Sequence, residues 1–153
     1  MRIHAASSAD LDDLTRLFAG YLLFYQEDKP SVAIRVFLAQ RLSRGDSMLF
    51  LARDPQGVAL GFVQLYPFQA SLVLQPAWLL SDLYVHEAAR RQGVGEALMN
   101  AARTHAESTG ACALQLQTAK SNLAGQALYE RLGYVRDDLF HTYWLALPPP
   151  GGD

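Results

Sequence analysis

The stretch RRQGVG, residues 90–95, places two arginines and two glycines where an apolar run ends and an alanine-rich helical stretch begins. The first N–H groups of a helix have no partner within it and carry about half a positive charge. Glycines remove Cβ atoms, so an anionic group can approach those donors closely. The loop therefore has the chemistry of a phosphate site, although a plain surface turn with solvated arginines fits the same residues.

Two familiar phosphate motifs do not match this loop. The phosphate loop of nucleotide hydrolases needs Gly-Lys-Ser/Thr, which is absent, and the dinucleotide fingerprint needs a third glycine where Leu98 stands. A nucleotide-binding interaction domain is therefore the weakest alternative.

A second candidate group lies about thirty residues further on. Asn122 and Tyr129 are seven residues apart and share one face of a short predicted helix. Gly125 follows Asn122 by one turn and is predicted to leave room on that face. Asn122 also suits a helix N-cap, and Tyr129 suits a core position with a satisfied hydroxyl.

These two blocks together resemble the GNAT superfamily of acyl-CoA-dependent N-acyltransferases. The family pattern Arg/Gln-x-x-Gly-x-Gly/Ala reads RRQGVG here, and the family block of an Asn followed by LYxxxGF/Y reads Asn122 and then ALYERLGY. The stretch LSDLYVHEAAR also looks like the strand before the loop. The resemblance covers most of the chain, while residues 8–45 match only in layout.

The resemblance implies that acetyl-CoA is the co-substrate. Backbone amides of residues 91–96 would hold its pyrophosphate, and the edge of the strand at residues 83–85 would pair with the pantetheine arm. An N–H near Tyr84 would stabilise the thioester oxyanion. The implied contacts are Leu83, Tyr84, Val85, Arg90, Arg91, Gln92, Gly93, Val94, Gly95, Glu96, Asn122 and Gln126.

The implied reaction is direct attack by an amine in a ternary complex, with Tyr129 donating a proton to the departing thiolate. A phenol of pKa about 10 protonating a thiolate of about 8.5 costs about 2 kcal/mol, which fits inside an ordinary barrier.

An alkylamine is mostly protonated near pH 7, so a base is needed. Asp82 is the candidate base, and regular alternation places it with Leu80 and Tyr84 unless a bulge intervenes. A structural Asp82 fits equally well. His86 and His141 are lone histidines that suit structural or exposed positions.

The acceptor is predicted to be a primary amine of a small molecule, bound by Tyr25, Glu27 and Tyr66. A protein amine remains an alternative acceptor. A non-catalytic acyl-CoA sensor remains an alternative to an enzyme.

The elements that position these residues follow from hydrophobic periodicity. Strands are predicted at 2–5, 48–52, 58–66, 71–74, 77–85, 113–118, 134–136 and 140–147, with YPFQ (66–69) as a bend. Helices are predicted from Ser7 or Ser8 to Tyr25, from Pro30 to Gly45, from Val94 to Ala106 and from Asn122 to Leu132. This is an α/β chain with a GNAT-like, mostly antiparallel twisted sheet of six to seven strands. A parallel pair lies at the acyl-CoA cleft, and about four helices flank the sheet.

Composition bounds the remaining possibilities. The 153 residues suit one domain, 1–147, with a disordered tail at 148–153. A net charge of −2 argues against a nucleic-acid partner, and the apolar runs are too short for a membrane span. The start has no signal-peptide pattern, and the single Cys112 suits a reducing cytoplasm. No residue set has metal-ligand spacing, and the family habit implies a homodimer.

Overall fold

The computed structural model describes residues 1–151, which form two compact units, Met1–Gln117 and a second that starts at Thr118. The strands are β1 (Arg2–Ala5), β2 (Met48–Arg53), β3 (Ala59–Ala70), β4 (Gln75–Val85) and β5 (Leu114–Leu116), and the helices of the first unit are α1 (Leu11–Phe24), α2 (Ser31–Arg44) and α3 (Val94–Ser108). The second unit holds α4 (Leu123–Arg131). No helix within residues 1–151 has the length and apolar character to cross a membrane.

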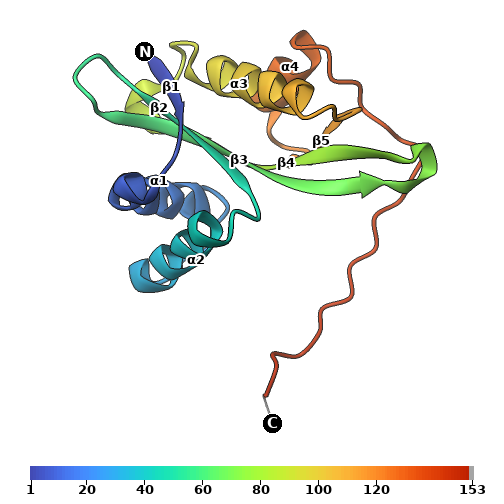
Figure 1. Cartoon of the computed structure of the whole chain (residues 1–153), viewed down its shortest axis with the longest axis horizontal. Helices are drawn as coiled ribbons and strands as arrows, with labels where there is room; N and C mark the ends of the chain where they lie inside the picture. Colours follow the sequence, from blue (N-terminus) through green and yellow to red (C-terminus); the bar gives the residue numbers. More distant parts are fainter. Residues whose placement is uncertain (152–153) are drawn as a thin grey trace. The chain divides into compact units, whose positions relative to one another are not determined.

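The first unit is built on one five-stranded sheet in the order β1-β2-β3-β4-β5. Neighbours from β1 to β4 are antiparallel, and β4 and β5 are parallel (Figure 1). The predicted mixed α/β sheet, its parallel pair and the four helices are confirmed. The predicted strand number is not, since five strands replace the expected six to seven.

Helices α1 and α2 pack together on one face of the sheet. Their apolar side chains recur every three or four residues and bury a stripe against the strands. The buried cluster is Leu14, Leu17, Phe18, Ile34, Leu38, Leu49, Leu51, Ala59 and Phe62. Gly45, at φ +62°, ends α2 in the left-handed conformation that glycine adopts at low cost.

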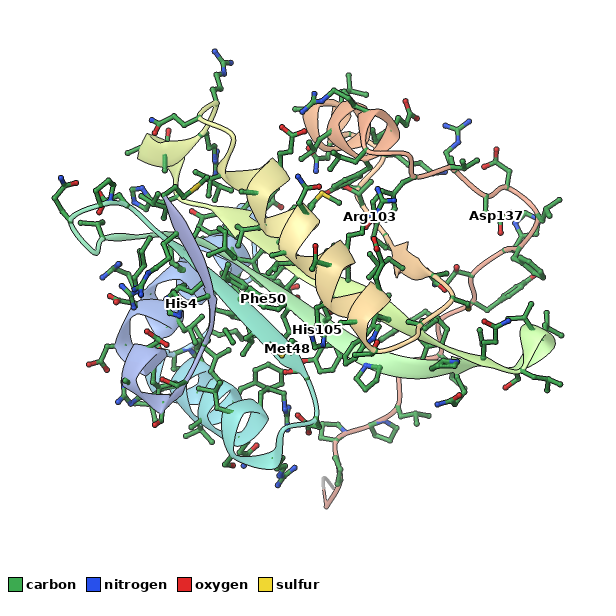
Figure 2. All side chains as sticks on the ribbon, turned by 45° about the horizontal axis from the view of Figure 1, so that its top comes forward. His4, Met48, Phe50, Arg103, His105 and Asp137 are labelled. Atoms are coloured by element: carbon green, nitrogen blue, oxygen red, sulfur yellow. The ribbon has the colours of Figure 1, made fainter. Side chains whose placement is uncertain are left out.

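Helix α3 lies on the opposite side of the sheet from α1 and α2 (Figure 1). A Cβ at Gly61 of β3 would lie 3.3 Å from a Leu98 methyl and 2.6 Å from the Tyr84 carbonyl oxygen, so only glycine fits there. Phe50 of β2 and His105 of α3 lie side by side on this face, with ring centroids 5.6 Å apart (Figure 2). The helical stripe predicted from Val94 to Ala106 is confirmed by the burial of its core positions.

The YPFQ stretch is not a bend, because β3 continues through it to Ala70. The last pair between β2 and β3 is Met48 with Leu65, so Pro67 lies beyond the region where β3 is flanked on both sides. A missing N–H there removes no ladder hydrogen bond to β2. The predicted strand at 71–74 is also wrong, since Ser71–Val73 form a 3₁₀ turn and Leu74 has φ +57°.

The two predicted C-terminal strands, 134–136 and 140–147, are not formed. Apolar alternation marks residues that are able to pair, but a strand forms only where a partner strand is present. In this segment Phe140, Tyr143, Trp144 and Leu147 are exposed. Residues 148–151 of the predicted tail form no helix or strand, and residues 152–153 lie outside the described residues.

Candidate functional site

The loop before α3 presents a run of main-chain donors. Gly93 is the N-cap, at φ +80°, and the first helical hydrogen bond runs from Ala97 N to Gly93 O at 3.0 Å. Within residues 1–151, the N–H groups of residues 91–95 donate to no protein acceptor. A Cβ built on Gly93 meets nothing within 4 Å, so the space beside Gly93 is open.

The loop backbone also has an unusual conformation. Arg91 has φ +64°, a left-handed value that is uncommon for residues other than glycine. Left-handed residues two apart, here Arg91 and Gly93, are typical of backbone concavities that hold anions. Gln92 steadies the turn, since its Nε2 donates to the Ala88 carbonyl at 3.4 Å.

The two arginines of the loop differ in their surroundings. Arg90 donates from Nε to the Val85 carbonyl at 3.0 Å, and its guanidinium lies 5.8 Å from the Phe24 ring centroid and 5.7 Å from that of Tyr84. Both arginines are exposed. Arg90 links the loop to the end of β4 through its hydrogen bond to the Val85 carbonyl.

The end of β4 that precedes this loop has an open edge. On one side β4 pairs with β3 along its length, but on the other side β5 pairs only with the stretch from Trp78 to Leu80. Beyond Leu80, no strand within residues 1–151 pairs with that edge. The predicted pantetheine contacts, residues 83–85, lie on this unpaired stretch.

A β-bulge settles the direction of Asp82. In the β3–β4 register, Gln64 faces Asp82 and Leu65 faces Leu80, so Ser81 is the extra residue. A regular strand would place Leu80 and Asp82 on the same face, and the bulge places them on opposite faces. Asp82 shares the face of Gln64, which lies two residues from Phe62 in the core beneath α1.

The side chain of Asp82 has one protein partner on this face. Gln64 Nε2 donates to Asp82 Oδ2 at 2.8 Å, and Ser47 Oγ donates to Gln64 Oε1 at 2.8 Å. Sequence reasoning did not single out Ser47 or Gln64. The available signal was a lone amide inside the apolar run ALGFVQLYPF.

The predicted acceptor residues come from two places in the fold, β3 and the segment that follows α1. Tyr66 of β3 lines a cavity of about 190 Å³ together with Pro67, Phe68, Leu79 and Gln115. Burial, and then the negative charge of Asp82, raises the pKa of Tyr66 to about 12, so its hydroxyl is neutral at physiological pH.

The other two predicted acceptor residues follow α1. Tyr25 caps its C-terminus with its ring 5.3 Å from that of Tyr21, and Glu27 is exposed with Lys29 Nζ 3.9 Å away. Tyr21 Oη donates to the Ser81 carbonyl at 3.4 Å, which links α1 to the bulge.

The second unit holds the Asn122 and Tyr129 block. Asn122 is the N-cap of α4, and its Oδ1 accepts from Gly125 N at 3.1 Å while its Nδ2 donates to Thr118 Oγ1. The room predicted at Gly125 is filled, because a Cβ there would lie 2.4 Å from Asn122 Nδ2. Gln126 donates to the carbonyls of residues 119 and 120. The Tyr129 ring lies 6.3 Å from that of Tyr134.

The lone histidines show no metal chemistry. His86 caps the 3₁₀ turn at Glu87–Ala89, accepting from Ala88 N at 3.2 Å, and His141 is exposed. Within residues 1–151, no group of three or more His, Cys, Asp or Glu side chains could hold a metal ion.

Comparisons with known proteins agree on one family. Residues 11–134 match the Acetyltransferase (GNAT) family. The chain is 35% identical to an "Uncharacterized N-acetyltransferase YhfO" of Bacillus subtilis, over 97% of this chain and 99% of that protein. It is 32% identical to an "Aminoglycoside N(6')-acetyltransferase type 1" of Klebsiella aerogenes, over 72% of each. A crystal structure of "a probable acetyltransferase" is 38% identical, with a TM-score of 0.90, and the match covers 97% of this chain and 99% of that one.

Proposed function

The chain belongs to the acetyltransferase (GNAT) family, and from this premise we propose that it transfers an acetyl group from acetyl-CoA to a primary amine of a small molecule. The observation that carries the proposal is the run of unmatched N–H groups at residues 91–95, with open space in front of Gly93. Five main-chain donors at a helix N-terminus suit a diphosphate.

The pantetheine arm is proposed to lie along β4. Its amides need strand-like hydrogen bonds, and the stretch at 83–85 has the open edge that supplies them. The Val85 carbonyl already accepts from Arg90, so the remaining main-chain groups around Tyr84 carry this role. An N–H of this stretch then polarises the thioester carbonyl and stabilises its oxyanion.

Asp82 is proposed as the proton acceptor. Within residues 1–151 no Lys or Arg lies at ion-pair distance from it, and its Oδ1 has no hydrogen-bond partner. Asp82 takes the proton from the acceptor ammonium, and the amine nitrogen attacks the thioester carbonyl carbon. The N–C bond forms, the C–S bond breaks with its electron pair on sulfur, and the nitrogen releases its second proton to solvent as the amide forms.

Tyr129 is proposed to donate a proton to that thiolate. Asn122 and Gln126 are proposed to contact the pantetheine part of CoA. These roles rest on the resemblance of Asn122 and ALYERLGY to the family pattern. The Asn122 side chain also has a capping role, so its loss is expected to weaken α4 as well.

The acceptor amine is proposed to bind beside Asp82, against Tyr66 and the end of α1. The cavity at Tyr66 has an apolar lining, and a neutral phenol suits contact with an alkyl or aromatic body. Tyr25 and Glu27 would form the opposite wall. The aminoglycoside acetyltransferase among the relatives supports a small-molecule amine.

A homodimer is proposed as the assembly. Tyr143, Trp144 and Leu145 each expose more than 80% of their surface, which is unusual for a stable isolated chain. Light scattering of the full chain and of a Trp144→Ser variant tests this. A monomeric mass for the full chain at micromolar concentration contradicts the proposal.

The first experiment measures CoA binding by calorimetry for the wild type and for Gly93→Ala. Gly57→Ala is the matched control, because Gly57 has φ +86° and equally open space in the β2–β3 turn. Both variants pay about 1 kcal/mol of backbone strain, but only Gly93→Ala is expected to weaken CoA binding. Equal affinities in all three proteins contradict the phosphate role of the loop.

The second experiment follows thiol release from acetyl-CoA with a panel of amines: an aminoglycoside, a polyamine, an arylalkylamine, an amino acid and a peptide with a free N-terminus. Tyr129→Phe is expected to keep CoA affinity and lose turnover. A wild type that binds CoA and acetylates none of these amines would instead point to the non-catalytic acyl-CoA sensor.

A further inference from the structure

Gln64 is the most deeply buried polar side chain of the sheet. It is 0% exposed, as are its neighbours Val63 and Leu65. An amide at such a position loses its hydration, and the loss is compensated only by hydrogen bonds within the protein. An apolar side chain of similar size would fill the same space without that cost. The partners of the two Gln64 hydrogen bonds therefore indicate the role of the amide.

The amide of Gln64 bridges two residues that come from different strands and loops. Its carbonyl oxygen accepts from Ser47, which directly precedes β2, and its amino group donates to Asp82 of β4, each at 2.8 Å. The bulge at Ser81 makes the second bond possible, because it sets Asp82 opposite Gln64 in the register. Ser47, Gln64 and Asp82 form what we call the Gln64 network.

The direction of each hydrogen bond follows from the ionised carboxylate. A carboxylate only accepts, so Gln64 must turn its amino group toward Asp82 and its carbonyl toward Ser47. The Ser47 hydroxyl then has to donate. Asp82 thus selects one of the two orientations of the amide, and Ser47, by donating to the amide oxygen, holds the amide against Oδ2 of Asp82. Oδ1 keeps its lone pairs free on the face beneath α1 and α2.

We propose that Gln64 is a positioning residue for Asp82, and that Ser47 holds Gln64 in the orientation that Asp82 requires. The inference rests on the proposed role of Asp82 as the proton acceptor. With Oδ2 anchored, Oδ1 is held toward the incoming ammonium. The ammonium N–H bond breaks, an O–H bond forms at Oδ1, and Gln64 keeps its bond to Oδ2 in both protonation states. Gln64 itself exchanges no proton.

The test compares Gln64→Met with Gln69→Met. Both residues lie on β3, but Gln69 is exposed. The pair therefore distinguishes the effect of losing the Gln64 network from the general effect of a Gln→Met substitution. A freed carboxylate rotates away from its productive direction, and kcat for the fastest amine of the panel is expected to fall about 10- to 100-fold in Gln64→Met. The KM for acetyl-CoA and the melting temperature are expected to change little. Gln69→Met should match the wild type.

Coupling to Asp82 distinguishes positioning from a structural role. Gln64→Met introduced into Asp82→Asn is expected to lower kcat no further, because residues that act as one unit are not additive. Ser47→Ala should lower kcat about threefold through the same unit, and Ser47→Thr, which keeps the hydroxyl, should restore it. If Gln64→Met does not fold, the kcat of Ser47→Ala still tests the network.

A spectroscopic readout separates this inference from the proposed function. The Gln64 side-chain amide should show NMR protons that exchange slowly with solvent and shift in Asp82→Asn. A kcat in Gln64→Met equal to wild type, with Asp82→Asn impaired, overturns the positioning role and leaves Asp82 as the base. Fully additive losses, or an amide resonance indifferent to Asp82, also overturn it. An unimpaired Asp82→Asn overturns the base assignment together with the inference.

Discussion

Two polar groups on the first unit differ in how completely their charges are matched. The Arg53 cluster (His4, Asp10, Asp13 and Arg53) joins β1, β2 and the start of α1, with every strong charge opposed. Arg53 contacts Asp10 at 2.7 Å and Asp13 at 2.8 Å, and its Nε donates to His4 at 3.2 Å. The Gln64 network carries one carboxylate held by a neutral amide.

Side chains of the Arg53 cluster also form hydrogen bonds with the backbone. Asp10 accepts from Ser7 N at 2.9 Å as part of a capping box, and Arg53 donates to the Gly57 carbonyl at 2.8 Å. Burial opposes the charge of Asp10, but the Ser7 amide and the Arg53 guanidinium outweigh it, and the pKa of Asp10 is lowered. Both carboxylate oxygens of Asp10 accept hydrogen bonds that hold the fold together.

The Arg53 cluster is therefore suited to stabilising the fold, and the Gln64 network leaves a carboxylate oxygen that is able to react. A matched charge has no capacity left for a ligand, whereas an ionised oxygen without a partner is able to accept a proton. The same sheet thus holds one site whose loss should affect stability and another whose loss should affect turnover.

The largest expected effect is on catalysis. Asp82→Asn removes the proposed proton acceptor while keeping a hydrogen-bonding side chain of the same shape, so kcat should fall about 10²- to 10⁴-fold. The melting temperature should stay near that of the wild type. Steady-state kinetics and a thermal melt on one preparation check both parts. A large loss of stability with kcat retained would show that Asp82 is a structural carboxylate like Asp10, and would contradict the difference between the Arg53 cluster and the Gln64 network.

Arg53→Met should give the opposite pattern. It leaves the buried carboxylate of Asp10 without its cation and Asp13 with Arg16 alone, which lowers the free energy of unfolding by about 3–5 kcal/mol, while kcat well below the melting temperature should be preserved. Arg103→Met is the control, since the Arg103–Glu107 pair is 68% and 67% exposed and contributes less than about 1 kcal/mol. Similar urea midpoints for the two variants would contradict the role of the Arg53 cluster.

The lowered pKa of Asp10 predicts an acid-sensitive contribution to stability. Because the folded-state pKa lies below the unfolded value of about 3.9, the stabilisation is complete above that pH and is lost as the pH falls through the folded-state pKa. Asp10→Asn should remove about 2 kcal/mol near neutral pH and flatten the decline in unfolding free energy below pH 4. Asp12→Asn, at an exposed position, should leave that decline unchanged.

The smallest expected effect concerns His105, which packs against Phe50 and Trp78 on the α3 face. Burial lowers the pKa of His105, so the unfolded chain takes up the proton first and stability decreases as the pH falls below about 6.5. His105→Gln should reduce this decrease between pH 7 and pH 5. His141→Gln, at an exposed histidine, is the control. Identical pH profiles for wild type and His105→Gln would contradict the effect.

Local signals predicted a large part of the fold and of the site. Gly45 ends α2 and Gly93 precedes α3 as expected, and Asn122 takes the N-cap position that was one of its two interpretations, because each depends on the backbone of a few neighbouring residues. The C-terminal strands at 134–136 and 140–147 were predicted from the same kind of signal and are not formed. A strand depends on a partner that lies far away in the sequence, so alternation alone was insufficient.

The sequence by itself determined the loop at residues 90–95, since helix capping and a left-handed glycine are local properties of the chain. Only the tertiary structure decided the direction of Asp82. That direction depends on a bulge at Ser81, on Gln64 eighteen residues earlier and on Ser47 beyond it. Register between strands is set by the packing of both faces of the sheet at once, and a single stretch of sequence does not contain that information.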